Sequence, residues 1–467
     1  MQAEFATVLP GALLWLAWCG ITHDSHKLLF MSGDMAASEN LSAALQDALR
    51  HVGQALSIPL RVVLWDGSSV AMSADEGLPS LTIRSPGVVA SLLKRPSLEN
   101  LVRHYAVGNL AVDGDLMAIG DSLSARVRKK DVKQLDKRLL LRKLWPFLFV
   151  RGEKAATRHD YGDGATAHAN VRNQDYIQFH YDVGNDFYRL FLDPEMLYSC
   201  AYFKDWNGTL EQAQLDKLDM ICRKLRLQKG ETFLDVGSGW GALLCYAAQH
   251  YGVQAHGVTL SQEQYEFTKA KISRLGLEGQ VTVEIRDYLA LEGSYDKVSS
   301  IGMFEHVGIA NFPAYFRKVN SLLKDNGLFL NHAIARRGKR DQKAALTRIT
   351  PEKRLILKYI FPGSELSPIG HSVNVMEAYG FEIHDVEAWR EHYALTTRRW
   401  CERLQANREQ AIGMVGLERY NLWIAYLAGV SFGFTAGSIL IFQTLGSKRG
   451  KAKGLSGLPP TRADLYR

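Results

Sequence analysis

The chain has 467 residues, 46% of them hydrophobic and 22% charged, and a formal net charge of +7. This length exceeds what one ordinary hydrophobic core accommodates, and the globular composition predicts two domains with connecting segments. The basic excess predicts an anionic partner, either nucleic acid or an anionic lipid surface. The five cysteines form no Cys-X-X-Cys pair and the histidines no His-X-X-X-His pair, so we expect reduced thiols, a cytoplasmic protein and no metal.

Residues 1–40 form an N-terminal extension of uncertain status. The apolar, uncharged run at 5–21 is short for a membrane-spanning helix and lacks the positively charged start of a signal peptide. Three interpretations stay open: an artefactual or disordered leader, with Met31 or Met35 as the alternative first residue, a membrane anchor, or a cleaved signal.

We expect residues 41–125 to form a small N-terminal α/β domain, because their sequence has a helical pattern followed by short strand patterns and further helical patterns. A basic linker at 126–175 follows. Its first part, 126–143, carries nine Lys/Arg residues against two acids, and it merges into the apolar and aromatic run LLLRKLWPFLFV. The pattern fits a helix lying on an anionic membrane and fits a solvated linker helix equally well.

Residues 176–445 alternate strands with helices, which predicts a parallel sheet covered on both faces. The apolar segment 420–445 is interrupted by glycines and ends in a strand-like run, so we expect a buried helix and a strand rather than a membrane span. The basic segment 336–354 predicts a surface lid or membrane-facing patch, or else a solvated helix. Residues 446–467 form a polar tail.

A glycine-rich turn between a predicted strand and a predicted helix marks a ligand site. Gly237, Gly239 and Gly241 give the pattern GxGxG, which differs from the GxGxxG of dinucleotide sites. The end of the next strand holds Thr259 and Ser261 in place of the acid that a nicotinamide cofactor requires. A nucleoside without a pyrophosphate therefore fits better than a dinucleotide.

Charged residues near this turn narrow the choice of ligand. Asp235 immediately precedes the turn, where its carboxylate could face an ammonium group. Arg286 and Asp287 end the third strand, where an adenine would lie. S-adenosylmethionine, which joins an amino acid to adenosine, satisfies all of these features.

Four longer motifs, within residues 180–203, 302–308, 331–335 and 390–400, give the chain a strong resemblance to the cyclopropane-fatty-acyl-phospholipid synthases, relatives of the mycolic acid cyclopropane synthases. The resemblance covers roughly residues 176–445. It implies a Rossmann-like class I methyltransferase domain with a mostly parallel seven-stranded sheet. The N-terminal domain is similar to the small lipid-carrier-like domain of the phospholipid branch.

The resemblance implies methyl transfer from S-adenosylmethionine to a cis double bond in a phospholipid acyl chain. The resulting carbocation loses a proton from the new methyl group to a bound bicarbonate, and the three-membered ring closes. Negative charge held beside a cation stabilises it. The resemblance also implies a homodimer that associates peripherally with the inner face of the membrane.

The resemblance assigns residues to two sets. The bicarbonate cradle comprises Cys200, Glu305, His332, Ile334 and Tyr393. The set that binds S-adenosylmethionine comprises Tyr198, Ser199, Asp235, Gly237, Ser238, Gly239, Thr259, Leu260, Ser261, Gln264, Arg286 and Asp287. We expect His306 to point to the opposite face from Glu305 and leave it out. A group of aromatic residues could line an acyl tunnel or a cation pocket, or could be core: Phe179, Tyr181, Phe187, Tyr188, Phe191, Tyr202 and Phe203.

Three features depart from the family pattern, and the two that follow the turn lie near the acyl side. The turn has Gly-Ser-Gly where many relatives have Gly-Cys-Gly, the stretch SELSPIG follows KYIFPG, and the 336–354 segment is longer than expected. Two alternatives remain: a synthase of methyl-branched or methylene products from the same carbocation, and a lipid-binding protein with a degenerate transferase domain. A nucleic-acid methyltransferase would be expected to carry a proline-cysteine or Asn-Pro-Pro-Tyr motif, and neither is present.

Overall fold

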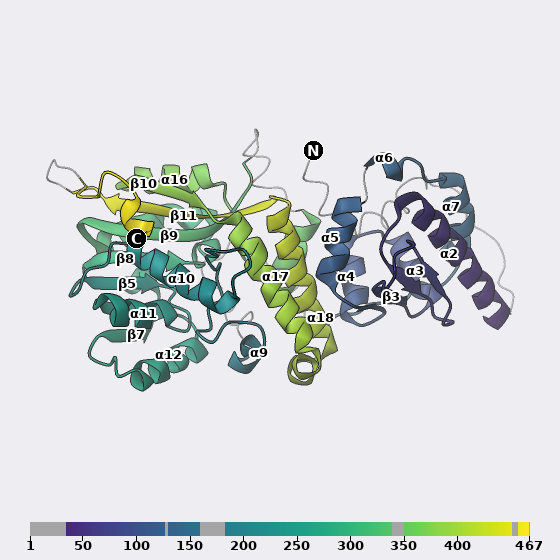
Figure 1. Ribbon diagram of the computed structural model, residues 1–467, viewed down its shortest axis with the longest axis horizontal. Helices are drawn as coiled ribbons and strands as arrows, with labels where there is room; N and C mark the ends of the chain where they lie inside the picture. The colour runs from purple at the N-terminus through teal and green to yellow at the C-terminus, as the bar shows by residue number, and fades with distance from the viewer. Residues whose placement is uncertain are drawn as a thin grey trace. The chain divides into compact units, whose positions relative to one another are not determined.

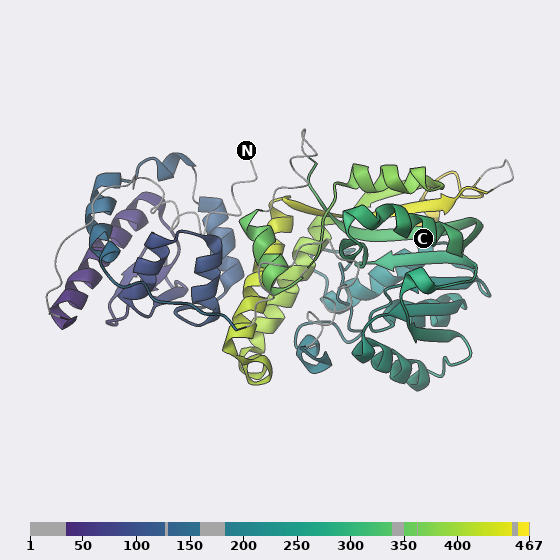
Figure 2. The same cartoon turned by 180° about the vertical axis from the view of Figure 1, so that it is seen from behind.

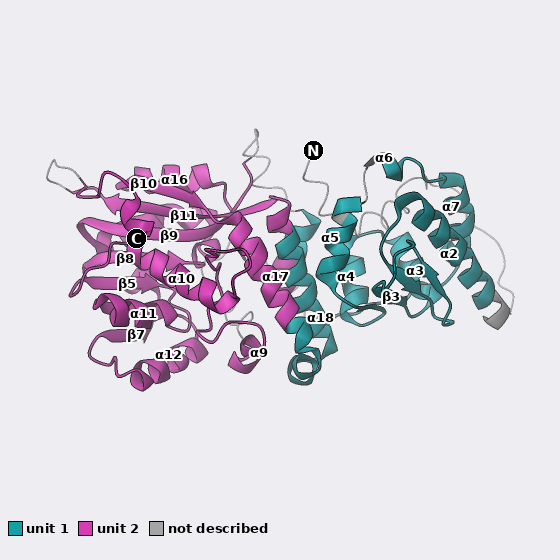
Figure 3. Cartoon of the chain, in the orientation of Figure 1, with its two compact units in different colours: residues 1–160, 350–355, 404–432 teal, residues 161–349, 356–403, 433–467 magenta. Residues whose placement is uncertain are grey.

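The structure is a computed structural model that describes residues 34–126, 129–158, 183–338, 350–361, 363–450 and 456–466. The chain divides into two compact units (Figure 3). Unit 1 contains residues 1–160, 350–355 and 404–432, and unit 2 contains residues 161–349, 356–403 and 433–467. The leader run at 5–21 and most of the connector before residue 183 lie outside the described residues.

Unit 1 is a small α/β fold. Its four-stranded sheet has the order β2-β1-β3-β4, in which only β1 and β3 are parallel. The strands are β1 (Arg61–Val63), β2 (Ser69–Ala71), β3 (Ser80–Ile83) and β4 (Leu110–Asp113). The helices are α2 (Asp34–Leu56), α3 (Pro86–Lys94), α4 (Leu98–Ala106) and α5 (Leu116–Arg126). Their apolar faces meet in one core that includes Leu49, Val62 and Val88.

The basic segment after α5 packs against this core. It forms α6 (Lys129–Val132), α7 (Lys137–Leu144) and the short 3-10 helix η2 (Trp145–Leu148). Leu140, Leu144 and Phe147 are buried in the unit 1 core, and Lys143 Nζ donates to Asp47 Oδ2 of α2 at 2.6 Å. One side of the segment is therefore packed into the hydrophobic core of unit 1.

A late part of the chain also belongs to unit 1. Asn421 lies in α18 (Arg408–Thr435), and its Nδ2 donates to the carbonyl oxygens of Tyr105 and Ala106 at 2.9 and 3.2 Å. Residues 404–432 thus group with the N-terminal residues, whereas sequence continuity had suggested one catalytic range of 176–445.

Because α18 is followed by β11 (Ile439–Lys448), the expected helix and strand in 420–445 are confirmed. Among the described residues, no helix combines the length and apolarity needed to cross a bilayer.

Unit 2 contains a seven-stranded sheet with the order β10-β11-β9-β8-β5-β6-β7. Four pairings are parallel, and β11 pairs antiparallel with both β9 and β10, which confirms the expected class I methyltransferase sheet. The strands are β5 (Thr232–Val236), β6 (Gln254–Thr259), β7 (Val281–Ile285), β8 (Tyr295–Ile301), β9 (Leu323–Arg336), β10 (Phe381–Ala388) and β11.

Helices cover both faces of this sheet (Figure 1 and Figure 2). Phe233 and Leu234 are neighbours on β5 and enter different cores, because side chains alternate along a strand. One core is closed by α10 (Leu210–Lys224), α11 (Ala242–Tyr251) and α12 (Gln262–Arg274), the other by α13 (Phe312–Leu322) and α16 (Ile369–Ala378). The remaining elements are α9 (Asn185–Arg189), η3 (Tyr288–Ala290), η4 (Phe304–His306), η5 (Ile309–Asn311), α15 (Pro351–Tyr359), α17 (Arg390–Ala406) and η6 (Ala463–Tyr466).

Candidate active site

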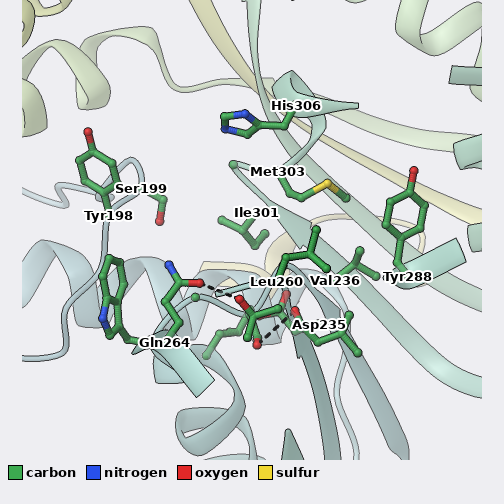
Figure 4. A pocket seen from close by; sticks show the side chains of 18 of the residues that line it. Tyr198, Ser199, Asp235, Val236, Leu260, Gln264, Tyr288, Ile301, Met303 and His306 are labelled. Atoms are coloured by element: carbon green, nitrogen blue, oxygen red, sulfur yellow. Dashed lines mark hydrogen bonds between the residues drawn. The ribbon is translucent and has the colours of Figure 1, made fainter. Parts of the chain in front are cut away.

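A cavity of about 490 Å³ opens at the carboxyl ends of β5, β6 and β8 (Figure 4). The glycine turn between β5 and α11 forms its floor. Gly237, Gly239 and Gly241 all have positive φ, and a Cβ on Gly241 would lie 2.4 Å from Thr268 Cγ2. The N–H groups of Gly237 and Ser238 both donate to the Val258 carbonyl at 3.0 Å, which holds the turn against β6. Positive φ favours glycine at these positions, and at Gly241 the contact with Thr268 leaves no room for a side chain.

Eleven of the twelve residues predicted to bind S-adenosylmethionine line this cavity: Tyr198, Ser199, Asp235, Gly237, Ser238, Gly239, Thr259, Leu260, Gln264, Arg286 and Asp287. Ser261 is not among the lining residues. Its hydroxyl instead caps α12, accepting from the Gln264 N–H at 3.3 Å. Thr259 Oγ1 donates to Gln264 Oε1 at 2.8 Å, so these two side chains fix each other on the cavity wall.

Asp235 provides a buried carboxyl group at the base of the cavity. Ser299 Oγ donates to Asp235 Oδ1 at 2.5 Å. Burial raises the pKa of Asp235 to about 6, opposed by the Ser299 hydrogen bond and by the charge of Lys217. A cationic group of a ligand would compensate this desolvated carboxylate.

The other end of the cavity suits a nucleobase. Leu260 at the end of β6 and Leu289 after β7 contribute apolar surface, and Leu289 is 49% exposed. Asp287 Oδ1 accepts from the Leu289 N–H at 2.9 Å and so shapes the 3-10 turn that carries this leucine. Arg286 lies beside them and pairs with Glu284 at 3.2 Å.

The five cradle residues are not among those that line the cavity. Four of them are buried, and Ile334 is partly buried. Glu305 lies in η4, four residues beyond the end of β8, and its Oε1 accepts from the Ile334 N–H at 2.5 Å. His332 and Ile334 are two residues apart on β9, so their side chains share one face of the sheet. The β9 register therefore brings the Glu305 carboxyl group to the strand that carries His332.

Trp389 connects the other cradle residues to His332. The Cys200 thiol donates to the Trp389 carbonyl at 3.8 Å, and the Tyr393 N–H donates to the same carbonyl at 3.1 Å. The ring of Trp389 packs edge-on against His332 with centroids 5.1 Å apart. A chain of contacts thus links all five cradle residues within unit 2, and all of them except the partly buried Ile334 are buried.

Two cradle atoms are buried without a hydrogen-bond partner in the described part of the chain: Glu305 Oε2 and His332 Nε2. Burial raises the pKa of Glu305 to about 7, and burial lowers the pKa of His332 well below its usual value. A neutral imidazole and a protonated carboxyl group each carry one N–H or O–H donor. Unsatisfied buried polar groups are costly, so a ligand that hydrogen-bonds to these two atoms would be stabilised there.

His306 lines the cavity (Figure 4) and Glu305 does not, so the two side chains face different sides, as expected. His306 is nevertheless a residue of the cavity wall that the sequence prediction left out. Both residues lie in the 3-10 turn at 304–306, beyond the end of β8 at Ile301. Burial lowers the pKa of His306 to about 4, so its ring is neutral at physiological pH.

Sequence reasoning also missed Lys217. Its Nζ is fully buried in α10 and donates to Ser199 Oγ at 2.7 Å, while Gln214 Nε2 one turn earlier donates to the Leu197 and Ser199 carbonyls. Burial lowers the pKa of Lys217 to about 8. These two side chains pin residues 197–199, which lead into Cys200. Gln214 and Lys217 are three residues apart on α10, so the sequence could have shown that they share one face of that helix.

The aromatic residues named from the sequence divide between two clusters, and Phe179 and Tyr181 lie outside the described residues. Tyr188 and Phe191 pack with Tyr198, whose ring lies 5.1 Å from that of Trp400. Phe187 joins this cluster through Phe191. Tyr202 and Phe203 pack against His392. The first cluster reaches the cavity through Tyr198.

Comparison with known proteins places this arrangement in a family. Residues 168–444 match the family described as mycolic acid cyclopropane synthetase. A probable fatty acid methyltransferase of Pseudomonas putida is 36% identical over 420 residues, which cover 89% of this chain and 98% of that relative. Cyclopropane mycolic acid synthase 1 of Mycobacterium tuberculosis is 35% identical over 271 residues, which cover 57% and 94%.

Two solved structures extend the similarity to the fold. The cyclopropane synthase MmaA2 of Mycobacterium tuberculosis gives a TM-score of 0.56 at 32% identity. The mycolic acid cyclopropane synthase CmaA1, solved in complex with SAH and CTAB, gives 0.55 at 35% identity. Each similarity covers 59% of this chain and 98% of the compared chain. The chain therefore belongs to the mycolic acid cyclopropane synthetase family of S-adenosylmethionine-dependent methyltransferases.

Proposed function

We propose that the protein transfers the methyl group of S-adenosylmethionine to the cis double bond of an unsaturated phospholipid acyl chain and closes a cyclopropane ring. The olefin attacks the methyl carbon, and a carbocation forms on the neighbouring carbon. The C–S bond of the sulfonium breaks in that step, and S-adenosylhomocysteine leaves with the electron pair. A proton then leaves the new methyl group, and the electron pair of that C–H bond closes the ring. The observation that carries the proposal is the pair of unpartnered buried atoms on Glu305 and His332.

These atoms fit a small planar anion such as bicarbonate. The Ile334 N–H occupies Glu305 Oε1, so Oε2 is the oxygen that can donate to an anion when the carboxyl group is protonated. His332 adds a second neutral group with an open nitrogen. Bicarbonate bound between them would supply a base for the methyl proton and a negative charge near the carbocation. Glu305 and His332 would hold and orient that anion.

The Asp235 end of the cavity supports the assignment of the methyl donor. Its buried carboxylate offers a partner for the ammonium group of S-adenosylmethionine, and Leu260 and Leu289 offer apolar surface for the adenine. Lys217 fixes Ser199 between this cavity and Cys200, so one helix orients both the donor pocket and the cradle.

An anionic membrane is the proposed source of the phospholipid. On α7 and η2, the side opposite the unit 1 core exposes Leu141, Trp145 and Phe149, and Phe149 is 72% exposed. Exposed Arg138 and Arg142 accompany them on α7. An apolar stripe flanked by basic residues matches the chemistry of an anionic lipid surface. A homodimer and a cytoplasmic location stay predictions from the sequence.

One alternative product has specific support. The Pseudomonas relative that matches 89% of this chain is named a probable fatty acid methyltransferase, without reference to a ring. The same carbocation could give a methyl-branched or methylene chain. Incubating the protein with methyl-labelled S-adenosylmethionine and unsaturated phospholipid vesicles, with and without bicarbonate, tests the proposal. The proposal is supported if the label appears in a fatty acid that resists mild hydrogenation and if the labelling depends on bicarbonate. It is contradicted if the label appears only in a chain that hydrogenation reduces, or if no lipid is labelled.

A further inference from the structure

We propose that Gln443 is a positioning residue that holds His332 in the tautomer with its proton on Nε2, so that an N–H donor faces the cradle. The inference rests on the proposed function for the role of His332 in the cradle. The arrangement of hydrogen bonds that carries it is independent of that role, and so is the first of the experiments below.

Strand register places the participating residues in one row. Across three antiparallel strands, Glu387 of β10 is paired with Gln443 of β11, and Gln443 is paired with His332 of β9. Directly paired residues project their side chains from the same face, so the three side chains are neighbours. Lys224, at the C-terminal end of α10, reaches into this row and forms an ion pair with Glu387.

The orientation of the Gln443 amide follows from the chemistry of Lys224. Lys224 Nζ lies 2.7 Å from Gln443 Oε1, and an ammonium group can only donate hydrogen bonds. The amide oxygen therefore faces Lys224, and the amide NH₂ group faces His332. This removes the usual ambiguity between the oxygen and nitrogen of a glutamine side chain.

The orientation of the amide in turn fixes the imidazole. Gln443 Nε2 lies 3.1 Å from His332 Nδ1. Because the NH₂ group donates, Nδ1 must present its lone pair, and the proton of the neutral ring is on Nε2. That nitrogen is buried and has no partner among the described residues. It is free to donate to an anion oxygen.

The surroundings leave little freedom for a different arrangement. The side chains of His332, Gln443 and Lys224 are each about 1% exposed, and the Trp389 ring contacts both His332 and the Lys224 ammonium. A flipped amide would direct its NH₂ group at the ammonium, so two donors would oppose each other in a site without solvent. With the other tautomer, the Nε2 lone pair would face the anion and repel it. Gln443 therefore acts on catalysis through the anion, with no contact to the methyl donor.

The first experiment measures the tautomer directly. Long-range ¹H–¹⁵N correlation spectra of the ¹⁵N-histidine-labelled full chain distinguish a protonated Nδ1 from a protonated Nε2, and a His332→Gln sample identifies the His332 signals. We expect Nε2–H in the unmodified protein and Nδ1–H in Gln443→Glu, because the new carboxylate accepts from Nδ1. Nδ1–H in the unmodified protein, or an unchanged pattern in Gln443→Glu, overturns the inference whether or not the protein makes cyclopropanes.

The second experiment measures the consequence. In Gln443→Glu, the bicarbonate concentration for half-maximal turnover should rise about tenfold or more, while the KM for S-adenosylmethionine changes less than about twofold. Thr444→Val alters the next residue of β11, whose side chain points to the other face, and should change neither value. Lys224→Met frees the amide to turn and should give mixed tautomers. If Gln443→Glu folds with the melting temperature of Thr444→Val but keeps the normal bicarbonate dependence, the proposed role is wrong.

Discussion

Glu305 and Ile334 are joined by a 2.5 Å hydrogen bond in which the backbone N–H of Ile334 donates to Glu305 Oε1. The bond is possible because β8 ends at Ile301 and leaves this part of β9 without a strand on that side. It determines which carboxyl oxygen is left open, and Oε2 is the open one. A strand end, a 3-10 turn and one backbone donor thus define the geometry of the cradle.

Replacing Glu305 should separate anion binding from cofactor binding. Glu305→Leu removes the donor and leaves the Ile334 N–H unpaired, so we expect kcat to fall about 100-fold or more. Glu305→Gln is the matched control. Its amide oxygen can accept from the Ile334 N–H, and its amide NH₂ group can donate from the position that Oε2 occupies in the unmodified protein. It should retain more of the activity. The dissociation constant for S-adenosylmethionine, measured by calorimetry, should change less than about twofold in both. Equal kcat for Glu305→Leu and the unmodified protein would remove Glu305 from the site.

The same carboxyl group should lower stability at neutral and alkaline pH. Its pKa is about 7 in the folded protein against an ordinary value of 4.5, so the unfolded state ionises first as the pH rises. As the pH rises from 4.5 to about 7, the free energy of unfolding therefore decreases. Above pH 7 the total decrease is on the order of 3 kcal/mol. Glu305→Gln lacks this penalty. Its urea midpoint should exceed that of the unmodified protein at pH 8 and differ little at pH 4; a difference that does not change with pH would contradict the burial of an uncompensated carboxyl group.

Asp235 should contribute mainly to binding of the methyl donor. Asp235→Asn keeps the shape and the contact with Ser299 but removes the charge that faces the proposed ammonium group. We expect the affinity for S-adenosylmethionine, measured by calorimetry, to fall about tenfold or more. Glu305→Leu, which lies outside the cavity lining, serves as the comparison. Unchanged affinity in Asp235→Asn would exclude the assigned orientation of the cofactor.

The exposed side of α7 and η2 should bind anionic vesicles. The double substitution Trp145→Ser/Phe149→Ser should weaken binding at every salt concentration, because it removes apolar contact. Arg138→Gln/Arg142→Gln should weaken binding chiefly at low salt. Arg61→Gln/Arg95→Gln removes the same charge from other exposed positions of unit 1 and should have a smaller effect. Equal losses for the two arginine pairs in a vesicle sedimentation assay would show that net charge alone is responsible.

The sequence predicted those parts of the fold and site that depend on local patterns. The glycine turn and the end of β6 at Thr259 both follow from neighbouring residues. Long-range register is different. Gln443 and His332 are 111 positions apart, and their pairing depends on how β11 inserts beside β9. No single-sequence pattern specifies that pairing, because shifting an antiparallel strand by two residues keeps its alternation.

Local exceptions explain the remaining differences. His306 was left out of the predicted site because the sequence does not reveal that the 3-10 turn at 304–306 brings its side chain to the cavity wall. The segment 126–143 could be read only as amphipathic, since the helical pattern does not reveal which apolar residues face unit 1 and which face solvent. The role of Asn421 in joining α18 to unit 1 depends on two backbone carbonyls at the end of α4, and carbonyls leave no trace in a sequence.

Ring formation on a phospholipid acyl chain can be tested by counting the deuterons in the product. The protein would be incubated with S-adenosylmethionine carrying a fully deuterated methyl group and with vesicles of unsaturated phospholipid, and the released fatty acids would be analysed by mass spectrometry before and after hydrogenation. Ring closure removes one deuteron from the methyl group, so we expect a product that retains two of the three deuterons and survives mild hydrogenation unreduced. A product that retains all three deuterons, or one that hydrogenation converts to a branched chain, would contradict it.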